Sequence, residues 1–322
     1  MASSIENQPI SKKTKGKRKY IPGLAAFKFK PTDDWTDYQA KELYKKKERK
    51  GLNTIFYEDC INGMEKLPAE SVDLIIADPP FGIEFDSMEE LYNRDSDFVI
   101  NNYHEVDKEE YDLFTEKWIS KLPKIMKDTS SAYIFSGWNN LEFVLAAARR
   151  AGLTLINHLI WTYSFGVFTM RKYVSSHYHI LFYVKDPDKY YFNKIIHYPL
   201  DSIEMKRNYK RGKKKNSTTL PKELVKKLMD FSSRPGDIVL DPFMGNGTTA
   251  VVAKGNYRHY LGFEINERLK SVINKNLDDM KIGALYQPYI TLKPSLQELA
   301  KKYPKAYKVI KEEGNPKKYW EI

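Results

Sequence analysis

One short stretch of the chain places polar and aromatic groups directly after a strand-like run. Residues 72–77 (Val-Asp-Leu-Ile-Ile-Ala) are mostly apolar and rich in β-branched side chains, which is typical of a strand buried on both faces. The strand must end at Asp78, because Pro79 and Pro80 have no N–H to give to a sheet and restrict the residues before them. Open α/β sheets bind ligands at the carboxyl ends of their strands, so Asp78 is expected to face a ligand.

The groups after this strand suit transfer to an amine nitrogen. The Asp78 carboxylate and the Pro79 carbonyl can accept the two N–H bonds of an exocyclic amine, which turns the nitrogen lone pair toward an electrophile. Phe81 offers a flat apolar face on which a heterocyclic base can stack. An ordinary strand-ending turn also explains such a tetrapeptide when it stands alone, so its interpretation depends on what accompanies it.

A second group of residues joins a glycine turn to two acids. Residues 238–241 (Ile-Val-Leu-Asp) predict a strand, and Gly245 and Gly247 lie in the turn between it and a helix. Glycines in such a turn let backbone N–H groups approach a ligand at the helix N-terminus. Glu264 ends the next predicted strand, where an acid can accept both hydroxyls of a ribose.

The glycine turn also fits the loose G-x-G-x-x-G/A pattern of NAD- and FAD-binding domains, which is a weak signal by itself. Asp241 comes just before the glycines, where it would repel a pyrophosphate but suits a ligand with an ammonium or sulfonium group. The sequence has no second nucleotide-binding half. We therefore expect S-adenosylmethionine as the ligand and keep an NAD-dependent oxidoreductase as an alternative.

Taken together, Asp-Pro-Pro-Phe at 78–81 and Asp-Pro-Phe-x-Gly-x-Gly-Thr at 241–248 resemble the motifs of the amino-DNA methyltransferases. Their order, with the Asp-Pro-Pro-Phe strand first, is similar to that of the permuted β group, and the resemblance runs from about residue 52 to residue 280. It implies a Rossmann-like α/β fold with a seven-strand sheet, mostly parallel with one reversed strand near an edge. It also implies S-adenosylmethionine as methyl donor and a target base flipped out of the duplex.

The resemblance further implies a set of site residues. The catalytic residues would be Asp78, Pro79, Pro80 and Phe81. They would position the amine for direct attack on the methyl group, without a covalent enzyme intermediate. The cofactor-binding residues would be Asp59, Cys60, Asp241, Phe243, Gly245, Asn246, Gly247, Thr248, Glu264 and Thr218. Leu220 stands where the family usually has a lysine, which leaves Lys222 as the candidate for the methionine carboxylate.

Basic residues are concentrated in two segments of a chain with net charge +11. Residues 1–50 hold 14 Lys/Arg against 6 Asp/Glu, and residues 206–215 hold 7 Lys/Arg and no acid. Such clusters attract phosphate backbones, although solvated and disordered tails are the alternative. In the family, a target-recognition region precedes the cofactor segment; it corresponds here to residues 185–216, with the loop at 83–106 as a second candidate. The residues expected to contact DNA or the target base are Trp161, Tyr163, Lys206, Arg207, Lys210 and Arg211.

Strand and helix patterns alternate along the chain, which predicts a parallel sheet with right-handed crossovers. Strands are expected at 54–59, 72–77, 131–136, 154–163, 178–184, 238–241 and 260–264. The expected parts are a basic and partly disordered extension at 1–50, a methyltransferase domain at 51–285 and peripheral helices at 286–322.

Other features exclude several classes of protein. No run of 18 apolar residues predicts a membrane span, and the polar, lysine-rich N-terminus does not resemble a secretory signal. The single cysteine, Cys60, excludes an internal disulfide and fits a reducing cytoplasm. His177 and His179 alternate along a strand, but no cluster of further ligands joins them, so we expect packing or hydrogen bonding and no metal site.

The expected function is site-specific methylation of adenine N6 in double-stranded DNA, in the cytoplasm and nucleoid of a bacterium or archaeon. The enzyme would be a solitary methylase or have a cognate restriction endonuclease, and a homodimer fits the β group. Cytosine-N4 methylation is the nearest alternative; Asp78 favours adenine because the cytosine enzymes more often carry serine there. A non-catalytic DNA-binding protein of the same fold is disfavoured by the intact motifs. Cys60 lacks a preceding proline, which disfavours cytosine-C5 methylation.

Overall fold

The structure is a computed structural model that describes residues 21–80, 110–164, 170–171, 173–206 and 219–312. It divides into a large unit of residues 30–293 and a small unit formed by residues 1–29 and 294–322. Several sequence predictions lie outside the described residues: those for Phe81, the loop at 83–106, Arg207, Lys210, Arg211 and Thr218.

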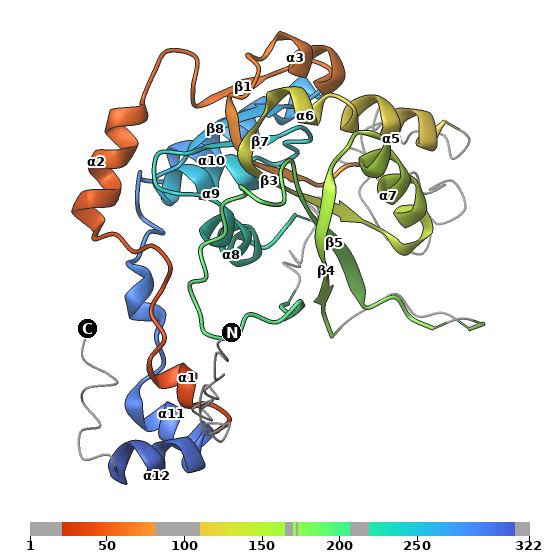
Figure 1. Ribbon diagram of the computed structural model, residues 1–322. Coiled ribbons are helices and arrows are strands. Elements are labelled where there is room, and N and C mark those ends of the chain that lie inside the picture. The colour runs from red at the N-terminus through yellow and green to blue at the C-terminus, as the bar shows by residue number, and fades with distance from the viewer. Residues whose placement is uncertain (1–20, 81–109, 165–169, 172, 207–218, 313–322) are drawn as a thin grey trace, which may run out of the picture. The chain divides into compact units, whose positions relative to one another are not determined.

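The described part of the large unit is built on one eight-stranded sheet (Figure 1). Its strands are β1 (Thr54–Phe56), β2 (Val72–Ala77), β3 (Met126–Ser136), β4 (Thr154–Thr162), β5 (His177–Val184), β6 (Ser202–Glu204), β7 (Ile238–Asp241) and β8 (His259–Phe263). They follow the order β1-β8-β7-β2-β3-β5-β4-β6. β5 runs antiparallel to β3 and β4, and the other neighbouring pairs are parallel. The Rossmann-like α/β class, with a reversed strand near one edge, is therefore confirmed.

The sheet has one strand more than the seven expected. The additional strand, β6, pairs in parallel with β4 at the edge of the sheet and buries Ile203. Its three residues, Ser-Ile-Glu, are too few to show the alternation by which a strand is recognised in a sequence. The end of the segment expected to recognise the target thus contributes to the sheet.

Helices cover both faces of the sheet (Figure 1). On one face lie α3 (Cys60–Lys66), α5 (Tyr111–Ile119), α6 (Leu122–Ile125) and α7 (Leu141–Arg150). On the other face lie α8 (Lys222–Ser232), α9 (Thr248–Gly255) and α10 (Lys270–Asp278). Three short 3₁₀ helices complete the described part of this unit: η1 (Trp138–Asn140), η2 (Glu267–Leu269) and η3 (Tyr289–Leu292). The interruption expected near Pro123 separates α5 from α6.

The compact large unit begins before the first strand. It starts at Lys30, so residues 30–50, including α2 (Asp37–Lys47), belong to it. The Asp34 carboxylate accepts a hydrogen bond from the backbone N–H of Tyr289 (2.6 Å), and the Tyr286 hydroxyl donates to the Trp35 carbonyl (2.7 Å). These contacts tie the N-terminal segment to the residues that follow α10.

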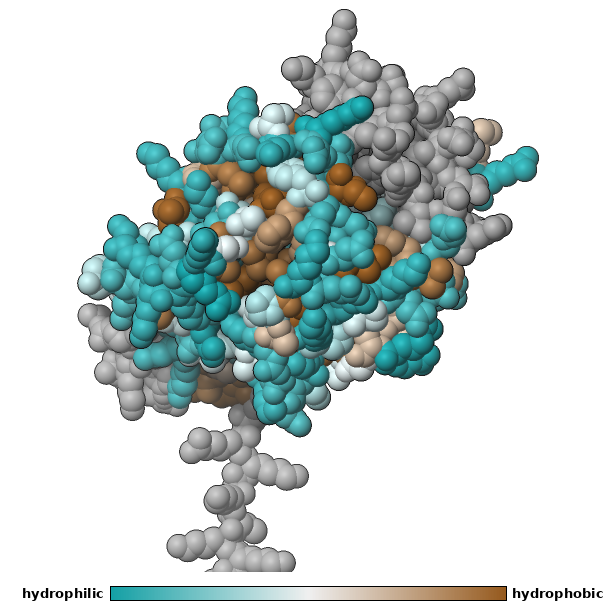
Figure 2. Space-filling model, turned by 90° about the horizontal axis from the view of Figure 1, so that it is seen from above, coloured by the Kyte–Doolittle hydropathy of each residue, from teal (hydrophilic) through white to brown (hydrophobic). Residues whose placement is uncertain are grey.

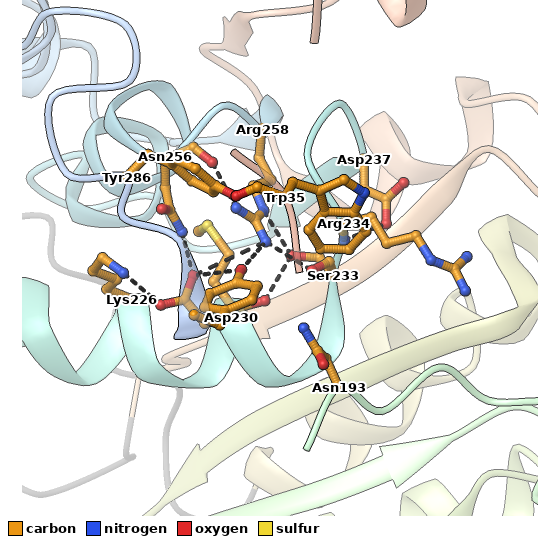
Figure 3. A network of polar contacts seen from close by, with 12 residues as sticks. Trp35, Asn193, Lys226, Asp230, Ser233, Arg234, Asp237, Asn256, Arg258 and Tyr286 are labelled. Atoms are coloured by element: carbon orange, nitrogen blue, oxygen red, sulfur yellow. Dashed lines mark hydrogen bonds and ion pairs between the residues drawn. The ribbon is translucent and has the colours of Figure 1, made fainter. Parts of the chain in front are cut away.

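A buried polar network joins the end of α8 to the start of β8 (Figure 3). The guanidinium of Arg258, which is 0% exposed, donates to the carbonyls of Asn256 (2.6 Å) and Ser233 (2.7 Å) and to the Tyr289 hydroxyl (2.9 Å). Asp230 provides the opposite charge at 4.0 Å and accepts a hydrogen bond from the Asn256 side chain (2.6 Å). Because its donors are satisfied, a full charge can be held in the interior here.

The small unit is a cluster of three short helices, α1 (Leu24–Phe27), α11 (Leu296–Lys302) and α12 (Pro304–Glu312). Its core consists of Ala26, Phe27, Leu299, Ala306 and Ile310. Residues near both ends of the chain therefore form one folded body.

The surface seen from above is mainly hydrophilic, with hydrophobic residues gathered in its middle (Figure 2). None of the helices in the described ranges combines the length and the apolar character needed to cross a bilayer.

Candidate functional site

Four of the predicted acids lie at one edge of the sheet. Asp59 follows β1, Glu264 follows β8, Asp241 ends β7 and Asp78 follows β2, and these four strands are consecutive and parallel in the sheet. The pairs Phe56–Phe263 and Asp241–Gly262 set the register, so the carboxyl ends of the strands meet at the same edge. The fold thus places both sequence motifs where open α/β sheets bind ligands.

The glycine turn between β7 and α9 has the backbone geometry that requires glycine. Gly245 and Gly247 have φ angles of 52° and 81°, in the left-handed region that side chains with a Cβ rarely adopt. Gly247 is the N-cap residue of α9. The Met244 N–H donates to the Phe263 carbonyl (2.8 Å), which holds the turn against the end of β8.

Glu264 is oriented by two backbone donors. Its carboxylate accepts hydrogen bonds from the N–H groups of Gly245 (2.7 Å) and Asn266 (2.8 Å), one on each oxygen. Burial raises the pKa of this carboxyl, and the two N–H groups oppose that effect. Each oxygen has a further lone pair, so the carboxylate can also accept two hydroxyl groups of a ligand.

Asp241 is the most deeply buried acid of the site, with 4% of its surface exposed. Burial raises its pKa to about 7; hydrogen bonds from the Thr249 side chain and the Phe243 N–H lower it, and the Glu264 charge raises it further. The Phe243 N–H lies 2.9 Å from the carboxylate. A carboxyl in this position gains most from a cationic ligand, which stabilises its ionised form.

Other predicted cofactor residues surround the turn. The Asn246 side chain donates to the Thr219 hydroxyl (3.3 Å), which brings the segment after Thr218 next to the turn. Thr248 is the half-buried first residue of α9. Leu220 packs against the hydrophobic core, which explains an apolar residue at that position, and Lys222 is exposed at the start of α8.

Asp59 and Cys60 start α3 at the edge of this group. The Asp59 carboxylate caps the helix by accepting from the Asn62 N–H (3.0 Å). Cys60 is buried, and burial together with the charges of Asp59 and Asp241 raises the pKa of its thiol. Cys60 therefore stays a neutral thiol within electrostatic reach of Asp241.

Phe243 anchors the turn to the helix layer. Its ring packs edge-on against Trp118 (centroids 5.2 Å apart, planes at 87°) and lies 6.0 Å from the ring of Phe114, both on α5. The side chain is half-buried, so part of it faces away from this cluster.

Asp78 and Pro80 are half-buried and Pro79 is buried directly after β2. A neighbour that the sequence did not indicate is Tyr111, the first residue of α5. Burial raises the pKa of the Tyr111 hydroxyl to about 12, and the Asp78 charge adds to this effect. No pattern in the sequence points from Tyr111 to Asp78, because the two residues meet only when α5 packs on the sheet.

Trp161 and Tyr163 are packed into the interior. Trp161 is 2% exposed, stacks on Tyr178 at 5.5 Å and donates its indole N–H to the Met205 carbonyl (2.9 Å). Tyr163, at 8% exposed, lies 5.6 Å from the Trp161 ring. Lys206 is exposed immediately after Met205. In this arrangement the two aromatic residues support the strand ends, and their part in holding a base stays a prediction.

The histidines on β4 and β5 contact one another. The His158 Nε2 and His179 Nδ1 atoms are 2.7 Å apart, and the rings of His177 and His179 are 5.0 Å apart. Burial and the neighbouring histidines lower the pKa of His179 to about 4. The described residues contain no grouping of three His, Cys, Asp or Glu side chains suited to a metal ion.

Comparison with known proteins gives consistent matches. The family described as DNA methylase matches residues 72–275, which include both motifs. The Type II methyltransferase M.HinfI of Haemophilus influenzae is 30% identical over 259 residues, covering 71% of this chain and 69% of that protein. The DNA adenine methyltransferase YhdJ of Escherichia coli (strain K12) is 31% identical over 257 residues, covering 70% and 82%.

The fold is also found among solved structures. The crystal structure of M1.HpyAVI in complex with SAM superimposes with a TM-score of 0.50 at 21% identity, covering 70% of this chain and 98% of that one. At this level of identity the likeness concerns the fold alone.

Proposed function

Since the chain belongs to the DNA methylase family, we propose that it transfers a methyl group from S-adenosylmethionine to the exocyclic N6 amine of adenine in double-stranded DNA. The observation that carries the proposal is the meeting of Asp78-Pro79-Pro80 with Asp241 and Glu264 at the ends of neighbouring parallel strands. Adenine is favoured by Asp78 and by the relative YhdJ, which is named for adenine.

The site residues fit S-adenosylmethionine, which supplies an electrophilic methyl group on a sulfonium when it is bound. Glu264, held by two backbone N–H groups, would accept the ribose hydroxyls. Asp241 would face the positively charged part of the cofactor, and Asp59 with Cys60 would lie by the adenine. Gly245 and its neighbours leave room for close approach at the start of α9. Two buried acids with raised pKa values suit such a cationic ligand rich in hydroxyls.

Asp78 would act on the target base and not on the cofactor. Its carboxylate and the Pro79 carbonyl would accept the two N–H bonds of the amine, orient its lone pair and stabilise the positive charge that develops on the nitrogen. The flipped base would stack on Phe81. The proposal places the enzyme in the cytoplasm with chromosomal DNA; a homodimer and a cognate restriction endonuclease stay predictions from the sequence.

The direct test is methyl transfer from labelled S-adenosylmethionine to unmethylated genomic DNA, followed by nucleoside analysis of the product. Labelled N6-methyladenine is the expected result. N4-methylcytosine would keep the mechanism and change the base, which is the second candidate because Asp78 and Pro79 can accept from either amine. Cofactor binding without transfer to DNA would point to an RNA substrate or a missing partner. Neither binding nor transfer would refute the enzyme.

The affinity for S-adenosylmethionine is expected to fall as the pH falls through 7. The pKa of Asp241 is raised to about 7, and the cationic ligand needs the ionised carboxylate. The ionised fraction rises from about one tenth at pH 6 to about nine tenths at pH 8, so Kd should decrease up to about ninefold over this range. Calorimetric titration at both pH values measures the change.

The control for this pH dependence is Asp241→Asn, which has no carboxyl to titrate. Its Kd should be weak and nearly independent of pH between 6 and 8. A wild-type Kd that does not change over this range would show that Asp241 does not face the charge of the cofactor.

A further inference from the structure

The small unit carries most of the net charge of the chain. Residues 1–29 and 294–322 together hold 14 Lys/Arg and 5 Asp/Glu, a balance of +9, whereas the whole chain has +11. The much longer large unit is therefore left with only +2. None of these residues lies within the part of the chain that matches the DNA methylase family, residues 72–275. The charge of the small unit thus calls for an explanation apart from the methyl-transfer site.

One face of α12 is fixed against the rest of the small unit. Ala306 and Ile310 are 0% exposed and pack with Phe27 and Leu299. Tyr307 stacks on Phe27 with ring centroids 6.3 Å apart. The helix is therefore held by its apolar face, and its orientation within the unit is set by packing.

The opposite face of α12 presents a row of lysines. Lys305, Lys308 and Lys311 are exposed and three residues apart, a spacing that keeps them on one side of a helix. The positions of Ala306 and Ile310 place the buried face on the other side. Lys301 and Lys302, also exposed, end α11 just before it.

Little in the described part of the unit neutralises this row. Lys308 lies 3.9 Å from Glu312, but both side chains are largely exposed, so the pair is weak. Lys311 lies 5.9 Å from the ring centre of Tyr307, a contact that leaves its charge intact. We define the lysine row as Lys305, Lys308 and Lys311.

We propose that the lysine row of α12 is a second DNA-binding surface, which holds the phosphate backbone without reading its sequence. The inference rests on the proposed function, because it takes DNA as the polyanion that the large unit already engages. Evenly spaced ammonium groups match a line of phosphates and release condensed counterions on binding. The N-terminal sequence Lys-Lys-Thr-Lys-Gly-Lys-Arg-Lys at 12–19 is joined to the same unit and adds to its attraction.

DNA fits this surface better than an anionic membrane does. A helix that lies on a bilayer inserts an apolar face between the lipid head groups. In α12 that face is already covered by the core of the small unit, which leaves only charge to offer. A second contact on the same chain would raise the effective concentration of DNA at the methyl-transfer site without new contacts there.

The test is the triple variant Lys305→Gln, Lys308→Gln, Lys311→Gln in the full-length chain. Glutamine keeps the helix propensity of lysine, so folding should be unaffected. Binding to a duplex of random sequence is measured from 50 to 200 mM salt. Each lost phosphate contact lowers the slope of log K against log salt by about 0.9, so the affinity of the wild type should fall about 40-fold more than that of the variant over this range.

The matched control replaces the same three lysines with arginine, which keeps the charge and should restore the wild-type slope. An unchanged slope in the glutamine variant, with normal methyl transfer, would overturn the second surface and leave the proposed function standing. A variant that loses binding to vesicles of anionic lipid but not to DNA would overturn it in favour of a membrane. Absence of DNA binding and transfer in the wild type would refute the proposed function itself.

Discussion

Replacing Asp78 with alanine is expected to lower kcat for methyl transfer about 10²- to 10³-fold while the Kd for S-adenosylmethionine stays within about twofold. The carboxylate would accept an N–H of the amine and stabilise a charge that exists only in the transition state, so its loss acts on the rate and not on cofactor binding. Single-turnover transfer to a saturating DNA substrate measures the chemical step, and calorimetry measures Kd.

Two comparisons separate this role from a general effect of losing an acid. Asp112, on the same face of the chain's α5 as its exposed partner Arg150, should be replaceable by alanine with kcat within about twofold, because exposed ion pairs contribute little. Asp78→Asn keeps one acceptor oxygen and should lose less activity than Asp78→Ala. A Kd that rises as much as kcat falls would assign Asp78 to the cofactor site instead.

The parts of the site that were predicted from the sequence depend on strong local signals. The β-branched run of β2 ends at two prolines, and the glycines of the turn adopt φ angles of 52° and 81° that few other residues tolerate. Each signal is read within a dozen residues and needs no knowledge of the fold. The alternation of strands with helices then brings the strand ends to one edge.

The features that were missed depend on contacts between distant segments. Tyr111 lies near Asp78 only because α5 packs on the sheet. Trp161 was expected beside a base, but its burial is set by Tyr178 across the strand pair and by the Met205 carbonyl. Arg258 gives no local sign of burial, since arginine usually lies at the surface. Periodicity describes single elements and not the partners that they find.

Arg258→Met is expected to lower the free energy of unfolding of the large unit by about 3–5 kcal/mol. Methionine fills much of the volume but donates nothing, which leaves the carbonyls of Asn256 and Ser233 without their donor and Asp230 without its nearby positive charge. Unfolding in urea, followed by circular dichroism, measures the change. Arg234→Met is the matched control, because that guanidinium is largely exposed, stacks over Tyr191 at 3.9 Å and should contribute only about 1 kcal/mol.

The same variant separates stability from catalysis. Arg258 precedes β8 and Glu264 follows it, so the length of the strand, about 20 Å, separates the network from the proposed cofactor site. At a temperature where Arg258→Met remains folded, its kcat and its Kd for S-adenosylmethionine should therefore match those of the wild type. A rise in Kd at that temperature would show that the network also sets the position of Glu264, and β8 would then transmit the disturbance from one end of the sheet to the other.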